Sequence, residues 1–83
     1  MKDINEFAIG DEEFDLIYKY IKIRYESNIS QRELASKIGI AQSTIARMEK
    51  NMHSMSISNF TKLLGVLGYK LEIIKKEDIN ESK

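Results

Sequence analysis

The chain of 83 residues contains no cysteine and no proline, and its formal net charge at neutral pH is zero. Without cysteine it can form neither disulfide bonds nor thiolate metal sites, so its stability must come from helix packing, from assembly, or from both. This composition is compatible with a reducing compartment, and we expect a cytoplasmic protein. A chain of this length accommodates one small hydrophobic core and is too short for two independent domains.

Long apolar runs and catalytic signatures are also scarce. The longest apolar patch, near residues 63–69, falls far short of the roughly 20 residues needed to span a bilayer, and the first residues do not resemble a targeting signal. The only histidine, His53, has no neighbouring carboxylate that the sequence identifies, and neither a glycine-rich phosphate loop nor a metal-ligand spacing occurs. We therefore expect no membrane contact, no enzyme activity, no cofactor and no metal site.

The zero net charge conceals an uneven distribution along the chain. Residues 1–15 carry one lysine and six acids, a net charge of −5, whereas residues 16–70 carry nine basic residues and three acids, a net charge of +6. Such segregation fits a protein with two different surfaces, a basic body and an acidic arm. An alternative is that the acids at positions 11–13 simply complement the positive end of a helix dipole.

Residues 30–50 predict two short helices joined by a tight turn. Ser30, followed three residues later by Glu33, forms a capping box that fixes the start of the first helix. A narrow apolar stripe follows, and Gly39 can adopt the left-handed conformation that ends a helix without a Cβ clash. The stripe consists of Leu34, Ala35 and Ile38. This pattern predicts a helix-turn-helix with one buried face.

The second helix of the pair should bury Ile45 and Met48, which are three residues apart. Its outward side chains are Gln42, Ser43, Thr44 and Arg47. In the major groove glutamine can be bidentate to adenine, arginine can be bidentate to guanine, and threonine can touch a thymine methyl group. These four residues are therefore candidate base readers on double-stranded DNA.

The segment resembles the lambda-repressor-like, Xre-family helix-turn-helix, whose members share a Gln-x-x-Leu-Ala core, a Gly turn and a Gln-Ser-x-Ile start to the next helix. The matching residues are Gln31, Leu34, Ala35, Gly39, Gln42, Ser43 and Ile45. The resemblance extends from about residue 14 to about residue 75. Within the family the chain is most similar to HigA-type antitoxins, which share its Phe-Asp-Leu-Ile, Ile-Ala-Arg-Met-Glu and Gly-Tyr-Lys-Leu-Glu-Ile segments.

The resemblance implies a sequence-specific transcriptional repressor, base contacts from the four outward residues, and an internal ion pair between Arg24 and Glu49. The expected phosphate-binding residues are Gln31, Arg32, Lys37, Lys50, Asn51 and His53. A HigA-like antitoxin would also neutralise a ribonuclease toxin. The acidic residues 3–15 are a candidate toxin-binding segment, or else a frayed arm. Alternatives are a stand-alone phage-type repressor, a restriction-modification controller, or a protein-interaction module without DNA affinity.

Two departures from the family pattern affect local expectations. Ala41 stands where the family usually has a serine or threonine N-cap, which costs about 1 kcal/mol of cap stabilisation. Asn51 and Met55 replace a more usual glycine and proline. Because asparagine tolerates the left-handed conformation expected after a helix, Asn51 should still end the second helix of the motif.

We predict an all-α bundle of four to five helices followed by one strand. A first helix over residues 11–27 should bury Leu16, Tyr20 and Ile23, with Phe14, Ile17, Ile21 and Tyr25 on a neighbouring face that is either an interface or a wider core face. A further helix should begin at Ser56 and end at Gly68, with Gly65 allowing close packing. Its predicted core residues are Ile57, Phe60, Leu63, Leu64 and Leu67.

Residues 69–75 alternate in polarity and are rich in β-favouring side chains, so they predict a strand. The only candidate partner within the chain is the weak segment 4–9, so we predict a homodimer with a two-stranded intermolecular ribbon. The dimerisation residues are Tyr69, Leu71 and Ile73. A two-fold dimer would read a palindromic operator with half-sites about 34 Å apart. The predicted organisation is a flexible acidic arm (1–10), the helix-turn-helix domain with its strand (11–75) and a disordered tail (76–83).

Overall fold

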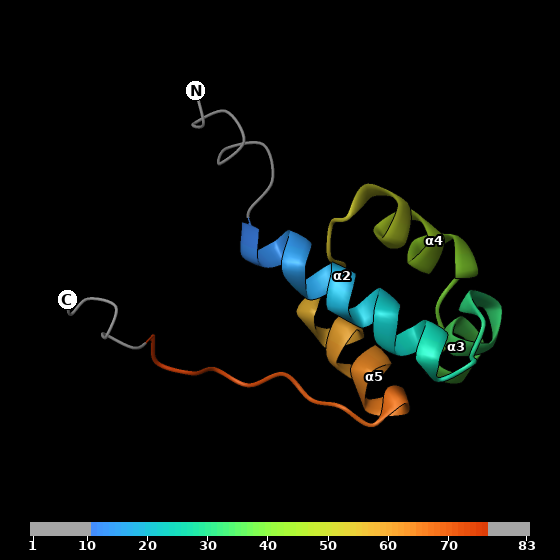
Figure 1. Cartoon of the computed structure of the whole chain (residues 1–83). Helices are drawn as coiled ribbons and strands as arrows, with labels where there is room; N and C mark the ends of the chain where they lie inside the picture. Colours follow the sequence, from blue (N-terminus) through green and yellow to red (C-terminus); the bar gives the residue numbers. More distant parts are fainter. Residues whose placement is uncertain (1–10, 77–83) are drawn as a thin grey trace.

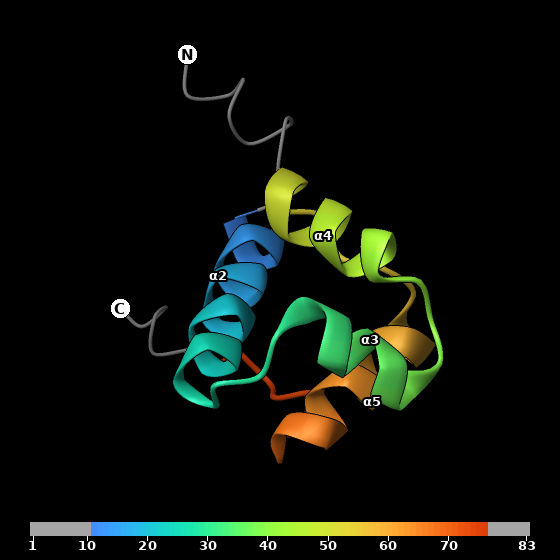
Figure 2. The same ribbon diagram turned by 90° about the vertical axis from the view of Figure 1, so that its right-hand side faces the viewer.

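The computed structural model describes residues 11–76, which contain four helices. They are α2 (Asp11–Glu26), α3 (Gln31–Ile38), α4 (Gln42–Asn51) and α5 (Ile57–Leu67). Both α2 and α3 pack against α4 and α5, as Figures 1 and 2 show. The predicted helical bundle is confirmed, whereas the predicted arm 1–10 and residues 77–83 of the predicted tail lie outside the described residues. Within residues 11–76 no helix is long and apolar enough to cross a membrane.

The boundaries of α3 and α5 follow from their capping residues. The Ser30 hydroxyl oxygen accepts a hydrogen bond from the backbone N–H of Glu33 at 3.0 Å, and Ser56 accepts one at 3.1 Å from the first turn of α5. At the other ends Gly39 and Gly68 have φ angles of +74° and +91°, which glycine adopts without steric cost. The residues that predicted these boundaries therefore form the caps.

The two ends of α4 differ from those of its neighbours. Ala41 makes no side-chain capping bond, as its identity predicted. At the C-terminal end the prediction for Asn51 was wrong, because Asn51 is still helical and Met52 adopts the left-handed conformation with φ of +58°. The Met52 side chain packs against the core, which offsets the steric cost of this conformation for a residue with a Cβ.

One hydrophobic cluster joins all four helices. Its buried members are Ile17, Tyr20, Leu34, Ala35, Ile45, Met48, Phe60, Leu63 and Leu64. Ile17 is completely buried, which supports the alternative that its face belongs to a wider core face, while Leu16 and Ile23 are only half-buried. The buried face of α2 is turned toward Ile17 because α2 packs against α4 as well as α5. Ile57, predicted to be buried, is exposed in the first turn of α5.

The C-terminal segment 69–76 differs from its prediction. It leaves α5 as an extended chain (Figure 1) and forms no strand within the described residues. Only its first residue is tied back, because the Tyr69 N–H donates to the Leu64 carbonyl at 2.9 Å. No strand or ladder occurs within residues 11–76. Pairing between two chains stays a prediction, and the alternative partner segment 4–9 lies outside the described residues.

The predicted role of Gly65 in close packing was wrong. Its open surroundings make it a suitable position for testing helix propensity. A Cβ added at this position would meet no atom within 4 Å, and the residue is exposed. Gly65→Ala should therefore raise the free energy of unfolding by about 0.5 to 1 kcal/mol through helix propensity. Gly39→Ala, at a positive φ, is the control and should lower it. A destabilised Gly65→Ala variant in urea unfolding would contradict this account.

Candidate nucleic-acid interface

The outward face of α4 carries hydrogen-bonding side chains in a helical stripe. Thr44, Arg47 and Asn51 are separated by three and four residues, a spacing that places them on one face of a helix. Gln42 and Ser43 are exposed in the first turn. Ile45 and Met48 are buried, and Met48 lies at the edge of the outward face. The predicted division of α4 into a buried apolar face and an outward polar face is confirmed.

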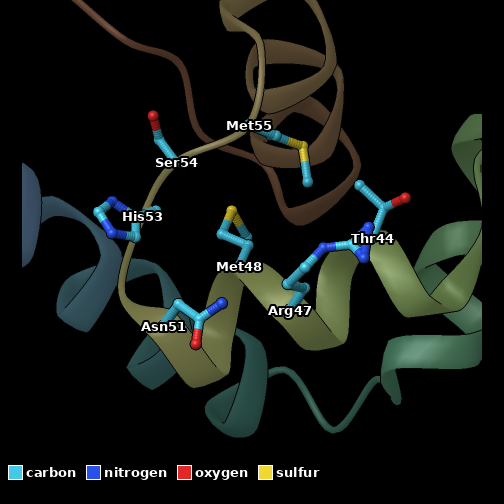
Figure 3. A pocket seen from close by; sticks show the side chains of 7 residues that line it. All are labelled: Thr44, Arg47, Met48, Asn51, His53, Ser54 and Met55. Carbon is cyan, nitrogen blue, oxygen red and sulfur yellow. The ribbon is translucent and has the colours of Figure 1, made fainter.

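An open hollow of about 300 Å³ runs along this face and onto the loop after α4 (Figure 3). It is lined by Thr44, Arg47, Met48, Asn51, His53, Ser54 and Met55. Figure 3 shows Thr44 and Arg47 toward one end and Asn51 and His53 toward the other, with Met48 between them. The structure thus brings two predicted base readers and two predicted phosphate ligands to one surface. Guanidinium, amide and hydroxyl groups there can donate to base edges or phosphate oxygens.

The other predicted phosphate ligands lie outside this hollow. Arg32 and Lys37 are exposed on α3, and Lys50 is exposed in the last turn of α4. Gln31 is half-buried, and its side-chain nitrogen donates to a Glu49 carboxylate oxygen at 2.9 Å. Because an amide nitrogen carries two hydrogens, this bond and a phosphate contact can coexist.

The buried side of α4 is attached to its neighbours through the Glu49 carboxylate. Arg24 donates to both of its oxygens, from Nε at 2.7 Å and from Nη2 at 2.8 Å, so the ion pair that the family resemblance implied is confirmed. The Tyr20 hydroxyl donates to the same carboxylate at 2.7 Å, and Gln31 completes the set. The side chains of Arg24 and Glu49 are only 7% and 8% exposed. We call these four residues the Glu49 network.

The Glu49 network orients α4 relative to two other helices. Tyr20 and Arg24 belong to α2, and Gln31 is the first residue of α3. Arg24 also donates from Nη1 to the carbonyl of Ile29 at 3.0 Å, which holds the turn between α2 and α3. Because the carboxylate accepts bonds from fixed directions, it restricts rotation of α4 about its axis. That restriction determines which side chains α4 presents outward.

The network also changes the proton affinity of its members. Burial raises the pKa of Glu49, but hydrogen bonds from Arg24, Tyr20 and Gln31 together outweigh burial, so the pKa lies below its ordinary value of 4.5. The pKa of Tyr20 is raised, first by burial and then by its bond to the Glu49 carboxylate. At neutral pH the network therefore contains an ionised Glu49 and a protonated Tyr20.

Glu13, on α2, contributes a contact that sequence reasoning missed. Its carboxylate accepts a hydrogen bond from the backbone N–H of Ser54 at 2.7 Å and lies 3.9 Å from Nδ1 of His53. The contact holds the loop that lines one side of the hollow. It joins residues 41 positions apart, so no local spacing in the sequence could have indicated it. One member of the acidic cluster is therefore engaged with this loop.

Two short helices joined at a left-handed glycine, the second with a polar outward face, define a helix-turn-helix domain. The helix-turn-helix family HTH_3 matches residues 19–74, which is more than half of the chain. The chain belongs to this Xre-like helix-turn-helix family.

Two curated relatives cover part of the chain. Antitoxin HipB of Escherichia coli O6:H1 is 43% identical over 42 residues, which is 51% of this chain and 45% of HipB. An uncharacterized HTH-type transcriptional regulator of Haemophilus influenzae is 37% identical over 59 residues, which is 71% of this chain and 60% of the relative. The matches thus span about half to three fifths of these relatives. No solved structure gives a significant match.

The Glu49 network predicts a specific dependence of stability on pH. Because the folded pKa of Glu49 is depressed, its contribution is present above the ordinary pKa of 4.5 and is lost as the pH falls through the lower folded pKa. Glu49→Gln leaves Arg24 buried without its counter-charge, so it should destabilise the protein at pH 7 by about 3 kcal/mol. The difference in unfolding free energy between the variant and the natural protein should become smaller when the pH is below 4.5. Urea unfolding at pH 7 and pH 3 measures this difference.

Glu26→Gln is the matched control for this experiment, because Glu26 is an exposed acid in the last turn of α2. It should change the unfolding free energy by no more than about 0.5 kcal/mol at either pH. If Glu49→Gln lowers the free energy of unfolding by the same amount at pH 7 and pH 3, the carboxylate charge contributes nothing to stability.

Proposed function

We propose that the protein is a double-stranded DNA-binding transcriptional repressor that acts as a homodimer and as the antitoxin of a toxin-antitoxin pair. It acts by binding and not by catalysis. The outward polar face of α4 carries this proposal, because it adjoins the hollow and is oriented by the buried Glu49 network. The Haemophilus relative, an HTH-type transcriptional regulator by name, supports the regulatory role.

In this proposal α4 enters the major groove and reads base edges. The base readers are Gln42, Ser43, Thr44 and Arg47. Cations and polar groups around α4 contact phosphates and hold the helix in register. The phosphate ligands are Gln31, Arg32, Lys37, Lys50, Asn51 and His53. The Glu13 contact with the loop at Ser54 fixes the edge of this surface, so that His53 approaches the backbone from a defined position.

The homodimer gives the proposed repressor its operator geometry. Pairing of the extended segment 69–75 with that of a second chain would supply the backbone partners that residues 11–76 do not offer. A two-fold dimer carries two copies of α4 and therefore binds a palindromic operator, with half-sites about 34 Å apart.

The antitoxin role is supported by the similarity to HipB, which is named as an antitoxin. The HigA-type resemblance adds the class of partner, a ribonuclease toxin. The protein would then neutralise the toxin and repress its own operon. A stand-alone phage-type repressor or a restriction-modification controller would share the DNA surface without a toxin partner.

The division between base readers and phosphate ligands is testable by substitution. Arg47→Ala should cost about 1 to 3 kcal/mol on the operator and relax the preference at one base position. Lys50→Ala should instead weaken binding to operator and random DNA alike and reduce the salt dependence by about one counterion. Gel-shift titrations over a range of salt, with the DNA upstream of the protein's own reading frame, measure both effects.

Lys22→Ala is the control for this pair, because it removes an exposed lysine from α2, outside the two motif helices. Its effect on affinity should be small. An equal loss on operator and random DNA for Arg47→Ala would reject its assignment as a base reader. If the natural protein binds neither DNA, the protein-interaction module is the better description.

The antitoxin role predicts a complex with the product of an adjacent small reading frame. When the two are expressed together, the untagged neighbour should copurify with the tagged protein and lose its toxicity. Arg47→Ala, which removes base reading, should leave this complex intact because its side chain points to DNA. A neighbour that neither copurifies nor is toxic alone would favour the stand-alone repressor.

A further inference from the structure

The hollow beside Arg47 has an apolar part between its polar ends. Met48 and Met55 both line it, although neither side chain can donate a hydrogen bond to DNA. Met48 belongs to α4 and is only 4% exposed, whereas Met55 belongs to the loop after α4 and is half-buried. Figure 3 shows Met55 projecting from the loop toward α4, with its sulfur on the Thr44 side of Met48. The proposed base readers and phosphate ligands include neither methionine.

The position of this apolar part limits which group of DNA can meet it. Arg47 lies toward one end of the hollow and His53 toward the other. In the proposed complex Arg47 contacts a base edge and His53 contacts a phosphate, so the methionines lie between a base edge and the backbone. The C5 methyl of thymine is the apolar group on the major-groove edge of a base pair. It lies on the backbone side of that edge, because C5 is closer than O4 to the glycosidic bond.

The size and the chemistry of the hollow suit this methyl group. A methyl group is about as large as a water molecule, whose share of liquid volume is roughly 30 Å³. The hollow has a volume of about 300 Å³, so it accepts the methyl group together with the adjoining edge of the pyrimidine. Thioether and methyl groups attract each other by dispersion and require no hydrogen-bond partner. Met55 also stands where the family usually has proline, so this part of the lining is particular to the chain.

We infer that Met48 and Met55 form a seat for the C5 methyl group of a thymine next to the base pair that Arg47 reads. This inference rests on the proposed DNA-binding function and names a further base of the operator and the residues that select it. Successive base pairs are about 3.4 Å apart along the helix axis. Because Arg47 and Met48 line the same hollow, the thymine should be an immediate neighbour of the base that Arg47 contacts.

Replacing thymine by deoxyuridine tests the contact directly, because deoxyuridine lacks only the C5 methyl group. The natural protein first selects a duplex from a random pool, and each thymine of that duplex is then replaced in turn. In gel-shift titrations one replacement in each half-site should raise the dissociation constant about fourfold, the effect of losing one buried methyl group. That position should adjoin the base pair at which Arg47→Ala relaxes the preference.

Two substitutions of Met55 assign the effect to the hollow. Met55→Gln keeps the length of the side chain but makes its end polar, so it should bind the thymine and deoxyuridine duplexes equally well. Met55→Leu is the matched control, keeps an apolar side chain and should retain the preference for thymine. On the deoxyuridine duplex Met55→Gln should bind within about twofold of the natural protein, because there is no methyl contact to lose. A misfolded variant would not meet this last expectation.

The outcomes separate this inference from the proposed function. If no replacement by deoxyuridine weakens binding, or if Met55→Gln keeps the full preference for thymine, the inference is overturned and the DNA-binding role stands. If Met55→Gln weakens binding equally on both duplexes, the methionine contacts a part of DNA common to all nucleotides, such as the deoxyribose, and the inference is again overturned. If the natural protein selects no duplex from the pool, the DNA-binding role and the inference both fail.

Discussion

The buried Glu49 carboxylate is the constraint on which the arrangement of the helices depends. A carboxylate that is 8% exposed must have its charge and lone pairs satisfied, and four donors from Tyr20, Arg24 and Gln31 satisfy them. These donors come from α2 and α3, so one carboxylate connects both helices to α4. Apolar packing alone would tolerate some rotation of α4, whereas a bidentate ion pair has a single best geometry.

The loop after α4 is held by different means. Its left-handed residue is Met52, and its backbone is anchored through Ser54 to Glu13 on α2. Thus α2 contacts both sides of the candidate surface, through the Glu49 network behind α4 and through Glu13 at the loop. One member of the acidic cluster at the start of α2 therefore anchors the loop, a contact that neither the dipole nor the partner-surface interpretation of the sequence included.

The features that could be predicted from the sequence are those that depend on residues close together in the chain. Serine caps, the glycine turn and the two faces of α4 follow from spacings of three and four residues, and the structure reproduces them. The rotation of α2 did not follow, because its apolar residues are too numerous to define one stripe, and the sequence left open whether Ile17 belongs to an interface or to a wider core face. The Arg24–Glu49 pair was accessible only through family resemblance. The Glu13 contact joins distant residues and left no local signal.

The predicted strand shows a different limit. Alternation at residues 69–75 indicates a chain suited to a sheet, but hydrogen bonding in a sheet is a property of two segments. Within residues 11–76 the second segment is missing, so the same sequence appears as an extended chain with exposed isoleucines. The pattern therefore identified the local conformation and not the element. Prediction of the candidate binding surface is limited in the same way. The fold determines which side chains are exposed, but affinity depends also on the ligand.

Three methionines lie at or just behind the candidate surface. Met48 and Met55 line the hollow beside Arg47, and Met52 packs against the core just behind the loop. Methionine side chains have three rotatable bonds and fill irregular space. Helix α4 is thus held at its buried face by the Glu49 network, while methionine side chains fill the space beside its outward face. In the proposed complex such a surface would adapt to small differences in groove width, and its side chains would lose entropy as they do so.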